Sequence, residues 1–162
     1  MADDYEDLTT CALSPELEAR LLHLQRECVF MWTNTDGEAF GVVMAVLPKD
    51  GRFWLTAAER RKRISAIRRF PRASLCFNST GTKMGPGKTI SYKGTCTVHT
   101  DRDTKEWFYP EFSRWLHRDE ATAAEFQRFL DSPHRVVIEF VPDYSLSFDG
   151  ELMMQRSPDA NW

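Results

Sequence analysis

The chain has 162 residues, of which 42% are hydrophobic and 28% charged, and its formal net charge is −3. This composition is typical of one globular domain and excludes a disordered or collagen-like chain. No apolar run approaches the roughly 20 residues of a membrane helix, and the acidic N-terminus is unlike a signal peptide, so neither a membrane protein nor an exported one is expected. The negative net charge argues against a general nucleic-acid-binding protein.

The four cysteines, Cys11, Cys28, Cys76 and Cys96, lie far apart in the sequence. No two of them have C-x-x-C spacing, and none has a histidine nearby at the spacing of a zinc site. A chain of this length without a secretion signal does not require a disulfide framework. We therefore expect reduced, mostly buried thiols, no metal site and a cytoplasmic location.

Residues 1–13 are acidic and aperiodic, and they are predicted to form a loose tail. A helix is expected to begin at Pro15, with Ser14 as its N-cap. Leucines at helical spacing as far as Leu24 give this helix one apolar face.

After this helix the pattern changes from helical to β. Three β-prone runs cover residues 28–33, 40–47 and 52–56. The turn-forming pairs Asp36-Gly37 and Asp50-Gly51 lie between them, which predicts an antiparallel meander.

A short basic helix and further strands follow. Residues 59–70 carry isoleucines on one side and basic residues around most of the rest, and Pro71 ends the helix. The later elements are a strand over 73–77, a glycine-rich loop over 79–87, a strand over 89–99, a helical region over 104–131 with a break near 117–120, and strands over 135–141 and 144–148. About seven strands without β-α-β alternation predict a mainly β fold, a closed or split antiparallel barrel with helices packed outside.

The glycine-rich loop resembles a nucleotide-binding P-loop only in part. Five residues separate Gly81 from the Gly-Lys-Thr that ends at Thr89, where the motif requires four. The loop also leads into a strand, whereas a P-loop leads into a helix whose N-terminus faces the phosphates. An NTPase is therefore not expected.

The basic segment after the third strand predicts an anion-binding site. Thr56 stands at the end of that strand, and Arg61, Lys62 and Arg63 follow on the next turn. Arginine forks, lysine and hydroxyl groups together bind a phosphate monoester well. The alternatives are a solvated basic face and a nucleic-acid surface, and the lack of interleaved aromatic residues argues against the latter.

No acid–base pair or nucleophilic triad stands out. The histidines, His23, His99, His117 and His134, are scattered through different predicted elements. If the protein is an enzyme, a cofactor is expected to carry the difficult chemistry.

Three stretches together resemble the pyridoxamine 5′-phosphate oxidase-like group, the FMN-binding split barrels. They are Asp50–Thr56 (DGRFWLT), Arg61-Lys62 and Pro71–Leu75 (PRASL). The order of elements agrees as well, including a long strand that contains Tyr92-Lys93-Gly94. The resemblance covers about residues 14–150, and it implies a split-barrel cofactor-binding domain there, between an N-terminal tail over 1–13 and a C-terminal tail over 151–162.

The resemblance implies a homodimer with FMN at the interface. In such proteins the strand before the Asp-Gly turn lies along the flavin ring, the end of the next strand meets the ribityl-phosphate region, and a basic pair holds the phosphate. The matching residues here are Val42, Val43, Met44 and Ala45 for the ring, Leu55 and Thr56 for the ribityl chain, Arg61, Lys62 and Arg63 for the phosphate, and Lys88 and Thr89 for a contact from the partner side. The dimer is expected to bury the aromatic residues of the 107–115 helix or the face of the meander.

Two departures from the family pattern affect these expectations. One extra residue lies between Lys62 and Pro71, so the phosphate ligand is either Arg61 or Arg63. The chain also ends soon after the last strand, which argues against vitamin B6 oxidation. The basic run and the Gly85–Lys88 loop are similar to branches of the fold that bind a deazaflavin, so the cofactor is expected to be FMN or, alternatively, a deazaflavin.

The expected function is that of a flavin- or deazaflavin-dependent oxidoreductase. It would transfer a hydride to or from a small organic substrate, with no nucleic acid or membrane as partner. The alternatives are a non-catalytic flavin or haem binding or storage protein, and a scaffold with an empty cleft.

Overall fold

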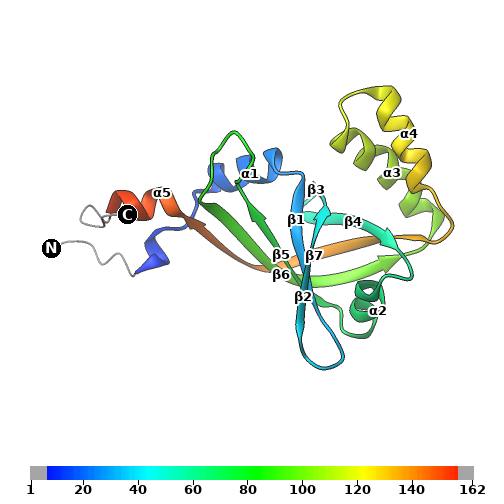
Figure 1. The fold of residues 1–162 in the computed structure, drawn as a ribbon, viewed down its shortest axis with the longest axis horizontal. Coiled ribbons are helices and arrows are strands. Elements are labelled where there is room, and N and C mark those ends of the chain that lie inside the picture. Colours follow the sequence, from blue (N-terminus) through cyan, green and yellow to red (C-terminus); the bar gives the residue numbers. More distant parts are fainter. Residues whose placement is uncertain (1–6, 157–162) are drawn as a thin grey trace.

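The computed structural model describes residues 7–156, which form a seven-stranded antiparallel sheet flanked by helices (Figure 1). The strands are β1 (Glu27–Thr33), β2 (Ala39–Ala45), β3 (Leu47–Lys49), β4 (Arg52–Ala58), β5 (Arg72–Asn78), β6 (Lys88–His99) and β7 (Arg135–Asp149). The helices are the 3-10 turn η1 (Leu8–Thr10), α1 (Pro15–Leu24), α2 (Lys62–Arg69), α3 (Arg102–Leu116), α4 (Glu120–Leu130) and α5 (Gly150–Arg156). The predicted mainly β fold with flanking helices is confirmed.

The sheet curls because its two edge strands are consecutive in the chain. The strand order is β2-β1-β5-β6-β7-β4-β3, and every pairing is antiparallel. Between β2 and β3 stands a single residue, the fully buried Val46, whose N–H donates to the Arg26 carbonyl at 3.0 Å. One bent segment therefore supplies both edges, as a split barrel requires.

Alternating side chains separate the barrel interior from its outer face. On β4, Phe53, Leu55 and Ala57 are buried in the barrel core, and the residues between them face outward. Where β6 crosses β7, Gly94 leaves no room for a side chain, because an added Cβ would lie 2.3 Å from the Val141 carbonyl oxygen.

Helices α3 and α4 build a second hydrophobic cluster on the outer face of β4 and β7. Its buried members are Leu47, Phe108, Tyr109, Phe112, Leu130 and Val137. The predicted break in the helical region is confirmed, since α3 ends at Leu116 and Asp119 caps α4 by accepting the Thr122 N–H. Figure 1 shows the helix pair at one end of the long β6 and β7 strands.

The last two predicted strands are one strand, β7. A register shift at Lys93/Gly94 lets the pairing continue past Pro142, which has no N–H to donate. Within the predicted loose tail, residues 11–13 contact the barrel: Cys11 and Leu13 are buried, and the Leu13 N–H donates to Ser147 Oγ at 3.0 Å.

Helix α5 occupies the start of the predicted C-terminal tail, and Arg156 donates to the Thr10 carbonyl at 2.6 Å. Residues 1–6 and 157–162 of the two tails lie outside the described residues. The four thiols are free, and Cys11, Cys28 and Cys96 are buried, as expected. Within residues 7–156, no helix combines the length and apolar character needed to span a bilayer.

Candidate phosphate and cofactor site

The N-terminus of α2 is open to an anion. Arg61 is the N-cap residue, it makes no side-chain capping bond, and no acidic residue lies in the first turn. The Ile64 N–H reaches the Arg61 carbonyl, but the amides of Lys62 and Arg63 have no backbone acceptor among the described residues. Free amides and the positive end of the helix dipole favour a bound anion at this position.

Three arginines gather beside this helix end: Arg61, Arg63 and Arg135, which we call the arginine cluster. The buried Nε of Arg63 has no hydrogen-bond partner. Burial, and then the charges of Arg61 and Arg135, lower the pKa of Arg63, and burial with the charge of Arg61 lowers that of Arg135. Within residues 7–156 none of the three forms an ion pair. The cluster therefore lacks a counter-charge.

The register of the sheet explains how Arg135 reaches this position. It pairs with Ala58, two residues beyond Thr56 on the outer face of β4. Thr56 donates its hydroxyl to the Val136 carbonyl at 2.8 Å. The buried Tyr109 of α3 lies beside Thr56, yet its hydroxyl has no hydrogen bond of normal geometry, and burial raises the pKa of Tyr109.

These groups fit a phosphate. Two buried polar atoms without partners, Arg63 Nε and Tyr109 Oη, lie close to an uncapped helix end and two further guanidinium groups. A phosphate group accepts several hydrogen bonds and carries the missing negative charge. The structure thus brings the predicted residues Thr56, Arg61 and Arg63 together. Arg61 and Arg63, the two alternative phosphate ligands, both belong to the arginine cluster.

Arg135 and Tyr109 were not identified from the sequence. Arg135 opens the last strand and Tyr109 lies within an aromatic-rich helix, and neither position carries a motif. The pairing of β4 with β7 and the packing of α3 on β4 bring them to Thr56. Arg135 could have been identified from the sequence only by predicting that it pairs with Ala58.

Lys62 lines a cavity that none of the residues of the arginine cluster lines. This cavity, of about 380 Å³, lies between α2 and the β1–β2 hairpin, and Phe40 of β2 and Arg69 of α2 also line it. The cavity runs along one side of α2, from Lys62 in its first turn to Arg69 in its last, and Phe40 at the beginning of β2 faces it.

β2, the strand predicted to carry the flavin ring, has a free edge. It pairs with β1 alone among the described strands, so backbone N–H and C=O groups on its other side remain available. Val42 is half-buried and Val43 is 64% exposed, whereas Met44 is in the core and offers a ligand its backbone only. Ala45 and Val43 line a second cavity, of about 700 Å³. Leu55 of β4 is fully buried, so its side chain faces the core and not a surface ligand.

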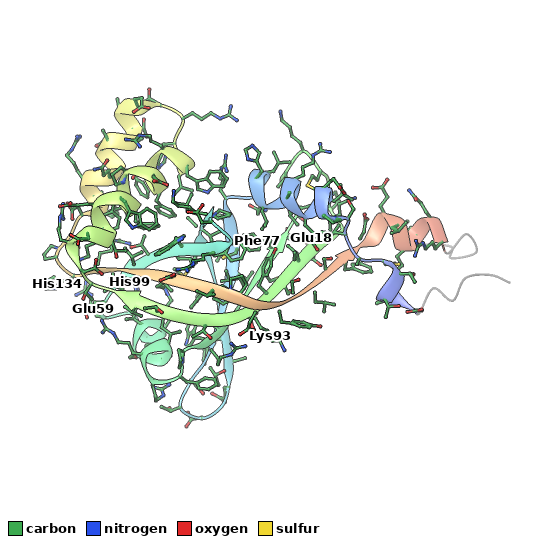
Figure 2. The ribbon with its side chains drawn as sticks, turned by 180° about the vertical axis from the view of Figure 1, so that it is seen from behind. Glu18, Glu59, Phe77, Lys93, His99 and His134 are labelled. Carbon is green, nitrogen blue, oxygen red and sulfur yellow. The ribbon has the colours of Figure 1, made fainter. Side chains whose placement is uncertain are left out.

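Lys88 and Thr89 lie far from the arginine cluster in the same chain. Lys88 pairs with Asp149 at one end of the β6–β7 ladder, and His99 pairs with Val137 at the other, beside Thr56. Eleven steps of about 3.3 Å separate these ends, or roughly 36 Å. Figure 2 shows His99, Glu59 and His134 together at the end that carries the cluster.

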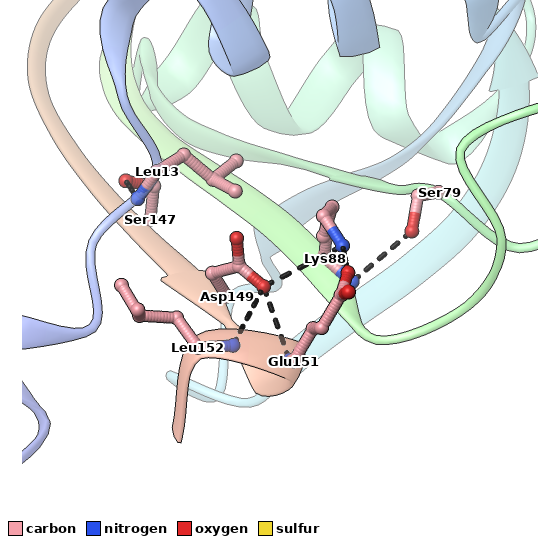
Figure 3. A network of polar contacts seen from close by, with 7 residues as sticks. All are labelled: Leu13, Ser79, Lys88, Ser147, Asp149, Glu151 and Leu152. Carbon is pink, nitrogen blue, oxygen red and sulfur yellow. Dashed lines mark hydrogen bonds and ion pairs between the residues drawn. The ribbon is translucent and has the colours of Figure 1, made fainter. Parts of the chain in front are cut away.

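The Lys88 side chain is engaged in a structural network (Figure 3). Its buried ammonium lies 2.9 Å from Glu151 and 3.5 Å from Asp149, and its amide donates to Ser79 Oγ at 3.0 Å. These contacts fasten α5 and the glycine-rich loop to the end of β6. Thr89 is half-buried and makes no such ion pair.

A family model described as pyridoxamine 5′-phosphate oxidase matches residues 13–145 of the chain. A comparison with curated proteins gives no match. A conserved hypothetical protein from Mycobacterium tuberculosis has a similar structure, with a TM-score of 0.75 and 15% identity over 95% of this chain and 93% of that one.

Two further solved structures are similar to the chain. An F420 reductase has a TM-score of 0.59 and 14% identity, over 78% of this chain and 94% of that one. An FAD-binding protein from Mesorhizobium loti has a TM-score of 0.59 and 17% identity, over 84% of this chain and 94% of that one. At these identities the likeness establishes a shared fold.

Proposed function

The chain belongs to the pyridoxamine 5′-phosphate oxidase family, and on that premise we propose that it binds FMN and acts as an oxidoreductase on a small organic substrate. The observation that carries this proposal is the arginine cluster at the uncapped end of α2, with Arg63 Nε and the Tyr109 hydroxyl left without partners. A phosphate dianion supplies both the charge and the acceptors that these groups lack.

The remaining contacts follow from the position of β2. Its first residues share a cavity with Lys62, so a ligand whose phosphate binds at the N-terminus of α2 would extend along the free edge of β2. Backbone groups from Val42 to Ala45 would then contact the ring, and the Thr56 hydroxyl oxygen would lie near the ribityl-phosphate junction.

A bound flavin supplies hydride transfer, and the chain supplies binding, orientation and exclusion of water. Arg61, Arg63 and Arg135 would hold the phosphate, and Tyr109 would donate to it. The apolar Val43 and the core beneath Met44 would keep one side of the ring away from solvent. We propose no catalytic acid or base.

A homodimer with the cofactor at its interface is part of the proposal. Thr89 lies far from its own chain's arginine cluster, so it would reach the phosphate end of the cofactor only from a second copy. Phe108 and Phe112 of α3 are already buried within the chain. The exposed apolar residues Val43, Tyr144 and Leu146 are therefore better candidates for the interface than the α3 aromatics.

A deazaflavin is the second candidate cofactor. Lys62 and the arginine cluster together provide four cations with no carboxylate partner among the described residues, more than one phosphate dianion requires. A cofactor with a longer anionic tail would use the excess charge. One of the structures with this fold is an F420 reductase, which agrees with this possibility.

The test is a titration of the purified protein with FMN, riboflavin and a deazaflavin coenzyme, followed by absorbance and fluorescence. The phosphate site predicts that FMN binds much more tightly than riboflavin, which lacks the phosphate. Failure to bind both FMN and the deazaflavin would refute the proposal, and a Soret band would assign haem instead. Reduction by NAD(P)H without substrate turnover would assign a storage or carrier role, and a monomer with bound cofactor would refute the interface.

A further inference from the structure

A further guanidinium without an ion pair among the described residues, that of Arg26, lies outside the arginine cluster, at the end of β2. The cavity of about 700 Å³ that contains Val43 and Ala45 is bounded by the α1–β1 corner, the glycine-rich loop and the last residues of α3. Arg26 is the one arginine or lysine that lines it, and Glu27 and His117 line it as well.

The Arg26 side chain has no carboxylate partner. Its guanidinium carbon lies 3.3 Å from the centre of the Trp115 ring, and its Nη1 donates to the His23 carbonyl at 2.9 Å. Its Nε and Nη2 have no hydrogen bond, and no acidic group pairs with it, within the described part of the chain. Burial, and then the charge of Arg118, lower the pKa of Arg26, as expected for an uncompensated cation.

The surroundings of Arg26 hold it in place before any ligand binds. The Trp115 side chain is held in position because its indole N–H donates to the Val46 carbonyl at 2.8 Å. The Arg26 carbonyl accepts the Val46 N–H at 3.0 Å. The Gln25 side chain donates to the Asn78 carbonyl at 2.7 Å, which ties the end of β5 to the same corner. A preorganised donor loses little entropy on binding.

We infer that this cavity binds the carboxylate of a small organic substrate, with Arg26 as its anchor. The inference rests on the proposed function, because Val43 and Ala45 line the same cavity and belong to the strand along which the flavin would lie. A guanidinium stacked on an indole keeps its edge free for a bidentate pair with a planar carboxylate.

The charge of the cavity favours a monocarboxylate over a phosphate monoester. One arginine and one glutamate line it, whereas the arginine cluster offers three guanidinium groups. A dianion beside Glu27 would be poorly compensated.

A third cavity, between Trp54 and Trp107, is unlike both of these sites. Its cations Lys49 and Arg52 are already paired with Glu111 and Glu139. It therefore offers no free charge to an anionic ligand.

The test uses the FMN-loaded protein and three probes of one shape: benzoate, benzamide and phenyl phosphate. Binding is followed by tryptophan fluorescence, because Trp115 contacts Arg26, and by the flavin absorbance. Benzoate should bind at least about tenfold more tightly than the other two, and Arg26→Met should weaken it by about tenfold or more. Arg26→Lys should retain part of the affinity.

Arg20→Ala is the control, since Arg20 is exposed on α1 and has no ion pair among the described residues. FMN affinity and the melting temperature should be unchanged in the Arg26 variants, which separates loss of the anchor from misfolding.

Benzoate binding that is absent, or equal in wild type and both Arg26 variants, would overturn the inference. Preference for phenyl phosphate would replace the carboxylate with a phosphate. If the protein failed to bind FMN but benzoate still bound through Arg26, the proposed function would fail and the carboxylate site would stand.

Discussion

Replacing Arg63 with methionine should weaken FMN binding without damaging the fold. Methionine fills similar space but removes the buried Nε and the charge next to Arg61 and Arg135. A charge-assisted hydrogen bond contributes about 1.5–3 kcal/mol. At about 1.4 kcal/mol per factor of ten, the dissociation constant for FMN should rise roughly 10- to 150-fold.

Although Arg63→Met should weaken FMN binding, it should not destabilise the protein without FMN. Burial and both neighbouring arginines lower the pKa of Arg63, so its charge is unfavourable in the absence of an anion. Removing that charge should leave the melting temperature of the apoprotein unchanged or raise it. The stabilisation that FMN gives to the wild type should shrink in the variant, because a weaker ligand shifts the unfolding equilibrium less.

Fluorescence titration with FMN and riboflavin, and thermal unfolding with and without FMN, measure both effects. Riboflavin affinity should stay close to that of the wild type, because Arg63 would contact the phosphate alone. Arg114→Ala is a suitable control, since Arg114 is exposed on α3. Unchanged FMN affinity in Arg63→Met would refute the phosphate site, and equal losses of FMN and riboflavin together with a lower apoprotein melting temperature would assign Arg63 a purely structural role.

Three further predictions concern the scaffold. Lys88→Met leaves the buried Asp149 carboxylate without its cation, so the free energy of unfolding in urea should fall by about 3 kcal/mol, and a fall close to zero would contradict the buried network. Burial raises the pKa of the Cys28 and Cys96 thiols from 9.0 to about 12, so the unfolded chain loses these protons first. Stability should be retained below pH 9 and decline as the pH rises toward 12, and equal urea midpoints at pH 8 and pH 11 would contradict this. Gly94→Ala puts a Cβ 2.3 Å from a carbonyl oxygen, so it should cost about 3 kcal/mol or more, measured by thermal unfolding against Thr95→Ala.

The sequence was sufficient for the general architecture. The alternation of apolar residues and the Asp-Gly turns are local signals, and they predicted the strands around residues 28–56 that the structure confirms. The predicted three-stranded meander is wrong, because β4 pairs with β3 and β7 and lies on the other side of the sheet from β2. Ser14 as N-cap predicted where α1 begins, and Pro71 predicted where the basic helix ends, but that helix begins at Lys62 and not at residue 59. The two strands predicted over residues 135–141 and 144–148 are one strand, because the register shift that carries β7 past Pro142 depends on the partner strand β6.

The basic run after β4 was also visible in the sequence, since Arg61, Lys62 and Arg63 are adjacent. Which other groups join this basic run to form an anion site depends on tertiary structure. Arg135 is far away in the chain and reaches the same place through strand pairing, and Tyr109 arrives through the packing of α3. Neither contact has a local signature, because strand register and helix docking are set by the whole core.

Which charges remain unpaired was likewise decided by the fold alone. Lys88 is one of six lysines in the sequence, and in the structure its charge is paired with Asp149 and Glu151. Arg26 carries no motif, and the fold leaves it stacked on Trp115 without a carboxylate. Residue types and short spacings determine which groups can bind an anion, but three-dimensional proximity determines which of them are free to do so.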